Sequence, residues 1–225
     1  MDDDLKQALY LIADEMRGMA TVGGHYARNP YEVERAERIQ DLAVRLTALI
    51  DSEHDEQEIR AAFEDTTLFH ASPVIGADVA VFNDQGEILL IQRRDNGLWA
   101  LPGGLAEIGR TLSESALLEL WEEAGLRGRV VRLLGLFDGQ RWGSRSKVHF
   151  THVLFQIHCD DLTPTPGLET REVRFFRADV LPPLFSGHDR IVPLCFELRH
   201  RAAHFDAASS VDTDLPTHQR RSRQA

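Results

Sequence analysis

Three glutamates lie close together on one predicted helix and could bind a metal ion. Glu119, Glu122 and Glu123 are three and four residues apart, so they share one side of the helix at about 100° per residue. Like charges at this spacing destabilise a helix unless solvent or a cation offsets their repulsion. A solvated acidic face is the commoner role of such a pattern. Carboxylate oxygens are also the ligands that Mg²⁺ prefers, together with waters and substrate phosphates.

The loop before this helix favours the metal interpretation. Residues 99–104 end in Pro-Gly-Gly, and glycine lets the backbone approach a ligand closely. Thr111 and Glu114 have the spacing of a capping box, and Gly125 is a typical C-terminal stop. We therefore expect a helix over residues 111–124 that begins directly after a ligand-binding loop.

Residues 104–126 resemble the Nudix hydrolase signature, G-x5-E-x7-R-E-U-x-E-E-x-G-U, in which U is aliphatic. Seven of its nine specified positions match, namely Gly104, Glu119, Leu120, Glu122, Glu123, Gly125 and Leu126. Two positions differ: Arg110 replaces the first Glu of the signature, and Leu118 replaces the Arg. The surrounding strand–loop–helix order also fits the Nudix fold.

The resemblance covers about residues 5–200. Residues 24–35 are similar to the N-terminal helical domain of one Nudix subgroup, which includes CDP-choline pyrophosphatase and proteins labelled ADP-ribose pyrophosphatases. Residues 134–138, 172–176 and 181–184 are similar to the same subgroup. The resemblance implies hydrolysis of a nucleoside diphosphate linked to another moiety, which releases a nucleoside monophosphate.

Carried over residue by residue, the resemblance also implies a metal site. Glu119 and Glu123 are the expected ligands of Mg²⁺ or Mn²⁺. Glu122 is a third ligand or holds a water, and the carbonyl of Gly104 is a further ligand.

The catalytic base varies within this superfamily, so several acids remain candidates. The residues expected to act in catalysis are Glu119, Glu122, Glu169 and Glu172. The last two lie late in the domain, near the entrance to a predicted strand. Opening that strand is the simpler role of Glu172.

Five residues are candidates for contact with the substrate: Arg93, Arg94, Gly103, Arg110 and Asp138. The two neighbouring arginines end a strand before the glycine-rich loop, although a solvent-exposed pair is their commoner role. If the guanidinium of Arg110 reaches the glutamates, it replaces the Arg that the signature lacks here. Alternatively, the altered signature leaves a catalytically weak nucleotide sensor or interaction protein.

Two aromatic residues and two histidines have less specific roles. Trp142 and Tyr26 could stack on a base, although packing is the commoner role of both. His149 and His152 are three residues apart, which places them on opposite faces of a strand and argues against a shared zinc site.

The elements that must position these residues fall into two parts and a tail. Residues 1–65 predict a small helical domain, with apolar stripes on two helices that are separated near residues 21–24. We expect these stripes to pack on the second domain or to form a homodimer. Residues 66–201 predict the Nudix domain, and residues 202–225 predict a polar, mobile tail.

The second part predicts strands from Val74 onward and a helix near residues 188–200. The turn at residues 83–86 predicts a hairpin between its first two strands. The expected fold class is α+β: a Nudix-type α/β/α sandwich with a mixed β-sheet, preceded by the helical domain.

Composition narrows the function classes. Lys and Arg number 25 and Asp and Glu 36, so the net charge is −11, which argues against general nucleic-acid binding. The sequence contains no apolar run of the roughly 20 residues that a membrane span needs. An acidic N-terminus and two cysteines favour a cytoplasmic location.

Overall fold

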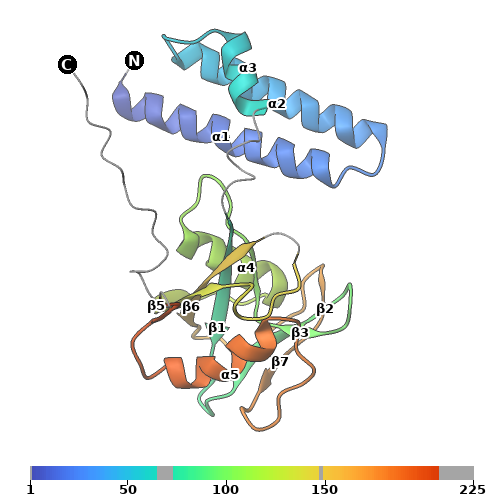
Figure 1. Cartoon of the computed structure of the whole chain (residues 1–225), viewed down its shortest axis with the longest axis vertical. Coiled ribbons are helices and arrows are strands. Elements are labelled where there is room, and N and C mark those ends of the chain that lie inside the picture. Colours follow the sequence, from blue (N-terminus) through green and yellow to red (C-terminus); the bar gives the residue numbers. More distant parts are fainter. Residues whose placement is uncertain (1, 65–72, 147–148, 208–225) are drawn as a thin grey trace, which may run out of the picture.

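The computed structural model describes residues 2–64, 73–146 and 149–207. Its N-terminal region consists of the helices α1 (Asp3–His25), α2 (Pro30–Ile50) and α3 (Glu56–Glu64). These helices pack together at one end of the molecule, next to the β-sandwich (Figure 1). Within the described residues, no helix combines the length and the apolar character that crossing a bilayer requires.

Two features of the helical region differ from the sequence prediction. The helix α1 continues through Gly23 and Gly24 to His25, where we expected it to end earlier. A Cβ atom on either glycine would lie within 4 Å of Ala36 of α2. The two glycines are poor helix formers, but they allow α1 to pack closely against α2. The helix α3 was not predicted, because its sequence is highly charged and Ile59 is its one buried residue.

The apolar stripe of α1 is only partly covered. Ala13 and Ala20 are buried, whereas Leu5, Ile12 and Met19 are 51%, 47% and 61% exposed. Residues seven apart share a side of a helix, so these three form one exposed apolar row. The helix therefore buries its small residues and leaves its large ones in contact with solvent.

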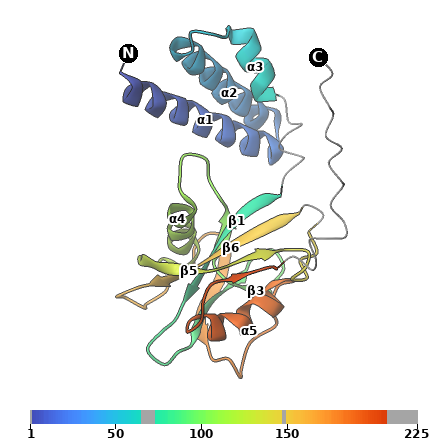
Figure 2. The ribbon, with the colours of Figure 1, turned by 60° about the vertical axis from the view of Figure 1, so that its left-hand side comes forward.

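The remaining residues form two sheets with a helix on either side (Figure 2). The five-stranded sheet has the order β4-β1-β6-β5-β8 and mixes parallel with antiparallel pairs. The three-stranded sheet has the order β3-β2-β7 and is antiparallel. The expected α+β sandwich with a mixed sheet is confirmed. The elements are β1 (Val74–Val81), β2 (Ile88–Arg93), β3 (Trp99–Ala100), β4 (Gly103–Leu105), α4 (Leu112–Ala124), β5 (Arg129–Asp138), β6 (Phe150–His158), β7 (Thr170–Phe176), α5 (His188–Leu198) and β8 (His204–Phe205).

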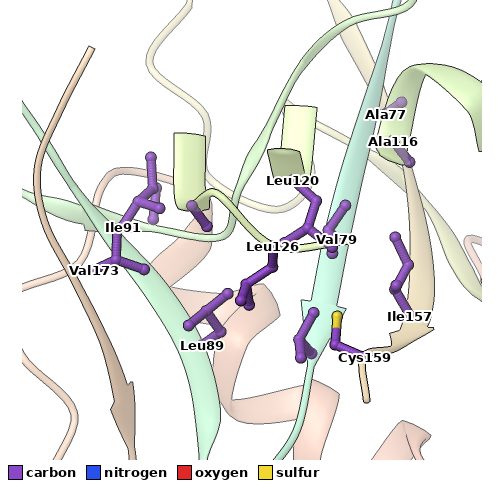
Figure 3. Packing of buried hydrophobic residues seen from close by; sticks show 13 residues of the cluster. Ala77, Val79, Leu89, Ile91, Ala116, Leu120, Leu126, Ile157, Cys159 and Val173 are labelled. Atoms are coloured by element: carbon purple, nitrogen blue, oxygen red, sulfur yellow. The ribbon is translucent and has the colours of Figure 1, made fainter. Parts of the chain in front are cut away.

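Each helix of the sandwich covers its own hydrophobic cluster. Leu120 and Ala116 of α4 pack against Val79 of β1 and Leu89 of β2 (Figure 3). Residues of α5, including Val192, pack in a second cluster with the opposite faces of the strands. Because α4 is held by both sheets, its position relative to β1 and β4 is fixed, and this position determines the geometry of the site.

The predicted hairpin is only partly formed. The turn at residues 83–86 is present, with the Gly86 N–H donating to the Asn83 carbonyl at 2.9 Å. Beyond a single bridge between Phe82 and Ile88, however, the two strands separate into different sheets. β1 pairs along its whole length with β6, and β2 pairs with β7, so each strand has another partner.

Regular structure also continues past the expected start of the tail. β8 pairs in parallel with β5, so residues just after 202 extend the sheet. Asp206 then accepts hydrogen bonds from the Trp142 indole at 2.9 Å and from the Asp138 N–H at 2.7 Å. The rest of the predicted tail, residues 208–225, lies outside the described residues.

Candidate active site

The helix α4 presents its glutamates because its other face is buried. Thr111 caps the helix in a complete capping box with Glu114, and Gly125 ends it in the left-handed conformation with a φ of 67°. Leu120 and its neighbours at a four-residue spacing, Ala116 and Ala124, are buried in the core. Glu119 and Glu123 are therefore held next to β4.

Glu119 and Glu123 lie against the glycine-rich loop. The Gly103 N–H donates to Glu123 Oε2 at 2.8 Å. A Cβ atom on Gly104 would overlap the carboxylate of Glu119, so this carboxylate can keep its position only beside a residue without a side chain. Both carboxylates thus lie against the backbone of β4.

Burial gives both glutamates unusual acidities. Burial, together with the charges of Glu122 and Glu107, raises the pKa of Glu119 to about 7. Burial likewise raises the pKa of Glu123 to about 8, although the hydrogen bond from Gly103 acts to lower this pKa. Glu122 is exposed and acts on Glu119 through its charge. A cation next to these two partly buried carboxylates would offset the repulsion between their charges.

The residues present fit a hard divalent cation. Two carboxylates and the nearby Gly104 carbonyl offer oxygen donors, which Mg²⁺ and Mn²⁺ prefer. In the described part of the chain, no group of three or more His, Cys, Asp or Glu side chains is arranged to hold a metal. Waters and substrate phosphates would therefore supply the remaining ligands.

A pocket of about 850 Å³ opens beside the two glycines that contact the glutamates. Gly103, Gly104 and Arg93 belong to its wall. Arg93 lies 4.8 Å from the ring of Phe185 and donates to Asp95 at 2.9 Å, which holds its guanidinium in place. The rest of the wall includes Tyr26, Asp78, Ser144, Arg145, His152, Ser186, His188 and Arg190.

Two histidines in the pocket wall have pKa values that are shifted in opposite directions. The Leu101 N–H donates to Nδ1 of His188 at 3.1 Å, and burial lowers the pKa of His188 to about 4, so this ring is neutral. Burial alone would lower the pKa of His152 as well. Asp78, 2.8 Å away, outweighs burial and raises the pKa of His152.

The structure separates the two late candidates for the base. Thr165 and Gly167 donate to carbonyls at the end of α4, so the loop before β7 is fixed against this helix. Glu169, in that loop, raises the pKa of both Glu119 and Glu123 through its charge. Glu172 instead pairs with Arg174 at 2.9 Å. Glu172 and Arg174 lie on the same face of the strand. Val173, between them, lies on the opposite face, where it packs in the core with residues of α4.

Three predicted contact residues are not among those that line the pocket. Arg94 donates to the Thr170 carbonyl at 2.8 Å and so joins β2 to β7. Asp138 pairs with His149 at 3.2 Å. Arg110 pairs with Glu107 at 2.7 Å, and among the described residues it forms no ion pair with Glu119, Glu122 or Glu123. Direct replacement of the missing signature Arg by Arg110 therefore does not occur in this structure.

Sequence reasoning missed several residues of this region. Glu107, in the loop before α4, raises the pKa of Glu119. Asp78, His152 and His188 come from β1, β6 and the start of α5, which only the tertiary fold brings together. One sequence signal was available, because Asp78 interrupts an otherwise apolar strand.

The helical region touches the same site. Ile108 packs against Gly18 of α1, and Glu15 of α1 lies beside Gly109, so α1 contacts the loop that leads into α4. Tyr26, at the end of α1, lines the pocket. Trp142, the other aromatic candidate, packs against Phe137.

Comparisons with known families divide the chain in a similar way. The NUDIX domain model matches residues 72–195. A model described as a UDP-X-like, N-terminal oligomerisation domain matches residues 7–63.

Individual proteins resemble this chain over most of its length. YjhB of Bacillus subtilis, named provisionally as an ADP-ribose pyrophosphatase, is 30% identical over 175 residues, which are 76% of this chain and 82% of the relative. The ADP-ribose pyrophosphatase of Methanocaldococcus jannaschii is 32% identical over 53% of this chain and 71% of its own. The crystal structure of a UDP-X diphosphatase has a TM-score of 0.58 and 25% identity, and covers 89% of this chain and 99% of its own.

Proposed function

The chain belongs to the Nudix domain family as a Nudix hydrolase, and we propose that it hydrolyses the pyrophosphate bond of a nucleoside diphosphate linked to another moiety. ADP-ribose-like and CDP-choline-like compounds are the proposed substrate class, and the products are a nucleoside monophosphate and the phosphorylated second moiety. We further propose that Mg²⁺ is the cofactor, with Mn²⁺ as a substitute.

One observation carries this proposal. Glu119 and Glu123 are partly buried beside Gly103 and Gly104, and these two glycines line a pocket large enough for a nucleotide derivative. Carboxylates so placed have raised pKa values, and a divalent cation would offset their repulsion. The ADP-ribose pyrophosphatases and the UDP-X diphosphatase among the similar proteins support the substrate class.

Different residues of the chain have different roles in the proposed reaction. Glu119 and Glu123, with the Gly104 carbonyl, would hold the cation, and exposed Glu122 would hold one of its waters. A divalent cation supplies charge neutralisation of the pyrophosphate and lowers the pKa of a bound water. Arg93 faces the pocket with its guanidinium fixed by Asp95, so it can bind a phosphate oxygen.

We propose Glu169 as the group that accepts the proton of the attacking water. It is exposed, and its charge acts on both buried glutamates. The loop that carries Glu169 is fixed to the end of α4 by hydrogen bonds at 2.8 and 3.2 Å. Glu172, the other late candidate, is engaged with Arg174.

The test is a panel of ADP-ribose, CDP-choline and UDP-glucose, incubated with the full-length protein and Mg²⁺ or Mn²⁺. Release of a nucleoside monophosphate from at least one compound, abolished by EDTA, supports the proposal. Absence of release from every compound contradicts it. If the compounds still bind, that result supports the alternative of a nucleotide sensor, consistent with Leu118 at the position of the signature Arg.

A further inference from the structure

The C-terminal strand β8 leads into a contact with a loop that forms part of the pocket wall. This pocket loop, residues 139–146, follows β5 directly. Four of its residues line the pocket, namely Gly143, Ser144, Arg145 and Ser146. The proposed cation ligands and the proposed base all lie in other segments. The proposed reaction therefore leaves the contact between β8 and the pocket loop without a role.

Asp206, directly after β8, makes this contact with both oxygens of its carboxylate. Oδ1 accepts a hydrogen bond from the Trp142 indole at 2.9 Å, and Oδ2 accepts one from the Asp138 N–H at 2.7 Å. The side chain of Asp206 is 22% exposed, and hydrogen bonds to a carboxylate are stronger than those between neutral groups. Asp138 precedes the pocket loop and Trp142 lies in its middle. One carboxylate thus holds the loop at two points.

Aromatic packing fixes the orientation of the same indole. The ring of Trp142 lies edge-on to Phe137 at 5.0 Å and to His204 at 5.1 Å. His204 in turn stacks on Phe137 at 4.8 Å, and Phe137 is fully buried. Trp142 is therefore held between β5 and β8, so the position of the pocket loop depends on a segment about sixty residues later in the chain.

The pocket loop in turn holds an arginine of α5. Arg190 Nη1 donates to the Arg141 carbonyl at 3.3 Å, and a Cβ atom on Gly143 would lie 3.1 Å from Arg190 Nε. Arg190 and Arg145 both line the pocket, and neither forms an ion pair with another described residue. In a chain with a net charge of −11, two such guanidinium groups in a pocket wall favour an anionic ligand.

We propose that Asp206 is a positioning residue for substrate binding, because its two hydrogen bonds hold the pocket loop where Arg145 and Arg190 can contact an anionic substrate. The inference rests on the proposed function, which identifies that substrate as a nucleoside diphosphate derivative. Asp206 is not among the residues that line the pocket, so it acts through the loop. Loss of its carboxylate should weaken binding and leave the chemical step nearly unchanged.

The direct test measures the dissociation constant of ADP-ribose for full-length variants in EDTA, which withholds the cation that turnover requires. Asp206→Ala removes both acceptor oxygens and should bind at least about fivefold more weakly. Asp206→Asn keeps one acceptor oxygen, so its affinity should lie between those of Asp206→Ala and the parent. If Asp206→Ala does not fold, Asp206→Asn decides the question by the same comparison.

A matched control separates positioning from a general loss of stability. Asn83 Oδ1 also accepts two backbone hydrogen bonds, at 3.1 and 2.9 Å, but the turn that contains it does not line the pocket. Asn83→Ala should therefore bind ADP-ribose as the parent does. The NMR signal of the Trp142 indole N–H, assigned from its loss in Trp142→Phe, should move in Asp206→Ala and stay in place in Asn83→Ala.

Two further measurements test the path through the loop. Arg190→Gln should also weaken binding of ADP-ribose. Its effect and that of Asp206→Ala should combine to less than the product of the two separate losses, because both act on the same wall. For a compound that the parent turns over, Asp206→Ala should raise KM at least about fivefold and keep kcat within about twofold.

Failure of the inference differs from failure of the proposed function. If the parent binds ADP-ribose but releases no monophosphate with Mg²⁺, and Asp206→Ala weakens that binding, the inference stands and the hydrolase proposal fails. Turnover by the parent with an unchanged KM in Asp206→Ala overturns the inference alone. An equal loss of affinity in Asn83→Ala overturns it as well, since Asp206 would then only stabilise the fold. A parent that neither binds nor hydrolyses any compound of the panel overturns both.

Discussion

Glu123 is the residue on which the proposed chemistry depends most directly. It combines burial, a pKa raised to about 8 and a hydrogen bond from Gly103. Glu123→Gln keeps the shape of the side chain but removes its charge, so it weakens coordination of a hard cation. We expect turnover to fall by about two orders of magnitude or more, with the fold intact as judged by circular dichroism.

The measurement is the rate of monophosphate release over a metal titration. Glu114→Gln is a suitable control, because Glu114 lies on the same helix but serves the capping box. Parent-like rates for Glu123→Gln at every metal concentration would remove Glu123 from the site.

The two buried glutamates also predict how stability depends on pH. Their pKa values in the folded protein, about 7 and about 8, lie above the ordinary value of 4.5. The folded state therefore binds more protons than the unfolded state between these limits. In EDTA, the free energy of unfolding should fall as the pH rises from about 5 to about 8.

Urea denaturation at several pH values measures this slope. The double variant with Glu119→Gln and Glu123→Gln should lose most of the slope, because amides do not titrate. Mg²⁺ should stabilise the parent more at the upper end of the range, where both carboxylates bind it without first losing a proton. Equal slopes for parent and double variant would contradict the raised pKa values.

At the scale of elements, the loop before β7 and the strand β7 give two neighbouring acids different surroundings. Glu169 lies in the loop that is bonded to α4, whereas Glu172 lies within β7 and pairs with Arg174. Glu169→Gln should therefore lower kcat at least about tenfold, in the range that loss of a general base gives. Glu172→Gln is the matched control and should keep kcat within about twofold, since its ion pair is exposed.

Steady-state kinetics on the best substrate of the panel measures both effects. A fall in kcat for Glu172→Gln alone would reverse the assignment. Parent-like kinetics for both variants would leave Glu119 as the remaining candidate for the base.

At the scale of the whole molecule, the helical region predicts a homodimer. The exposed row of Leu5, Ile12 and Met19 needs a partner, and residues 7–63 match an oligomerisation domain. We expect the parent to be a dimer by light scattering at micromolar concentration. Met19→Glu and Leu49→Glu, at positions 61% and 79% exposed, should shift it towards monomer by placing a charge in the interface.

Val180→Glu provides the control, because Val180 is 64% exposed but belongs to the sandwich. It should leave the mass unchanged. A monomeric parent, or a dimer that survives both helical variants, would place the interface elsewhere.

The sequence alone determined the family and the central helix. The signature residues, the capping box and the apolar face of α4 are local patterns, so they specified this helix and its glutamates without tertiary information. It also predicted α5 to within a few residues, because its apolar periodicity is strong. The short strands β3 and β4 were missed because they are stabilised by contacts with distant segments, and α3 was missed because its sequence is highly charged.

The tertiary structure decided which polar residues meet. Glu169 and Glu172 are both glutamates near the start of a predicted strand. Only Glu169, in a loop that is hydrogen-bonded to α4, is placed so that its charge raises the pKa of Glu119. Arg110 lies within the signature segment in sequence, yet it pairs with Glu107 and not with the signature glutamates. Asp78 and His152 are 74 residues apart and meet because β1 and β6 pair in parallel. Partners of this kind depend on strand order and register, which are set by burial across the whole domain and not by any local pattern.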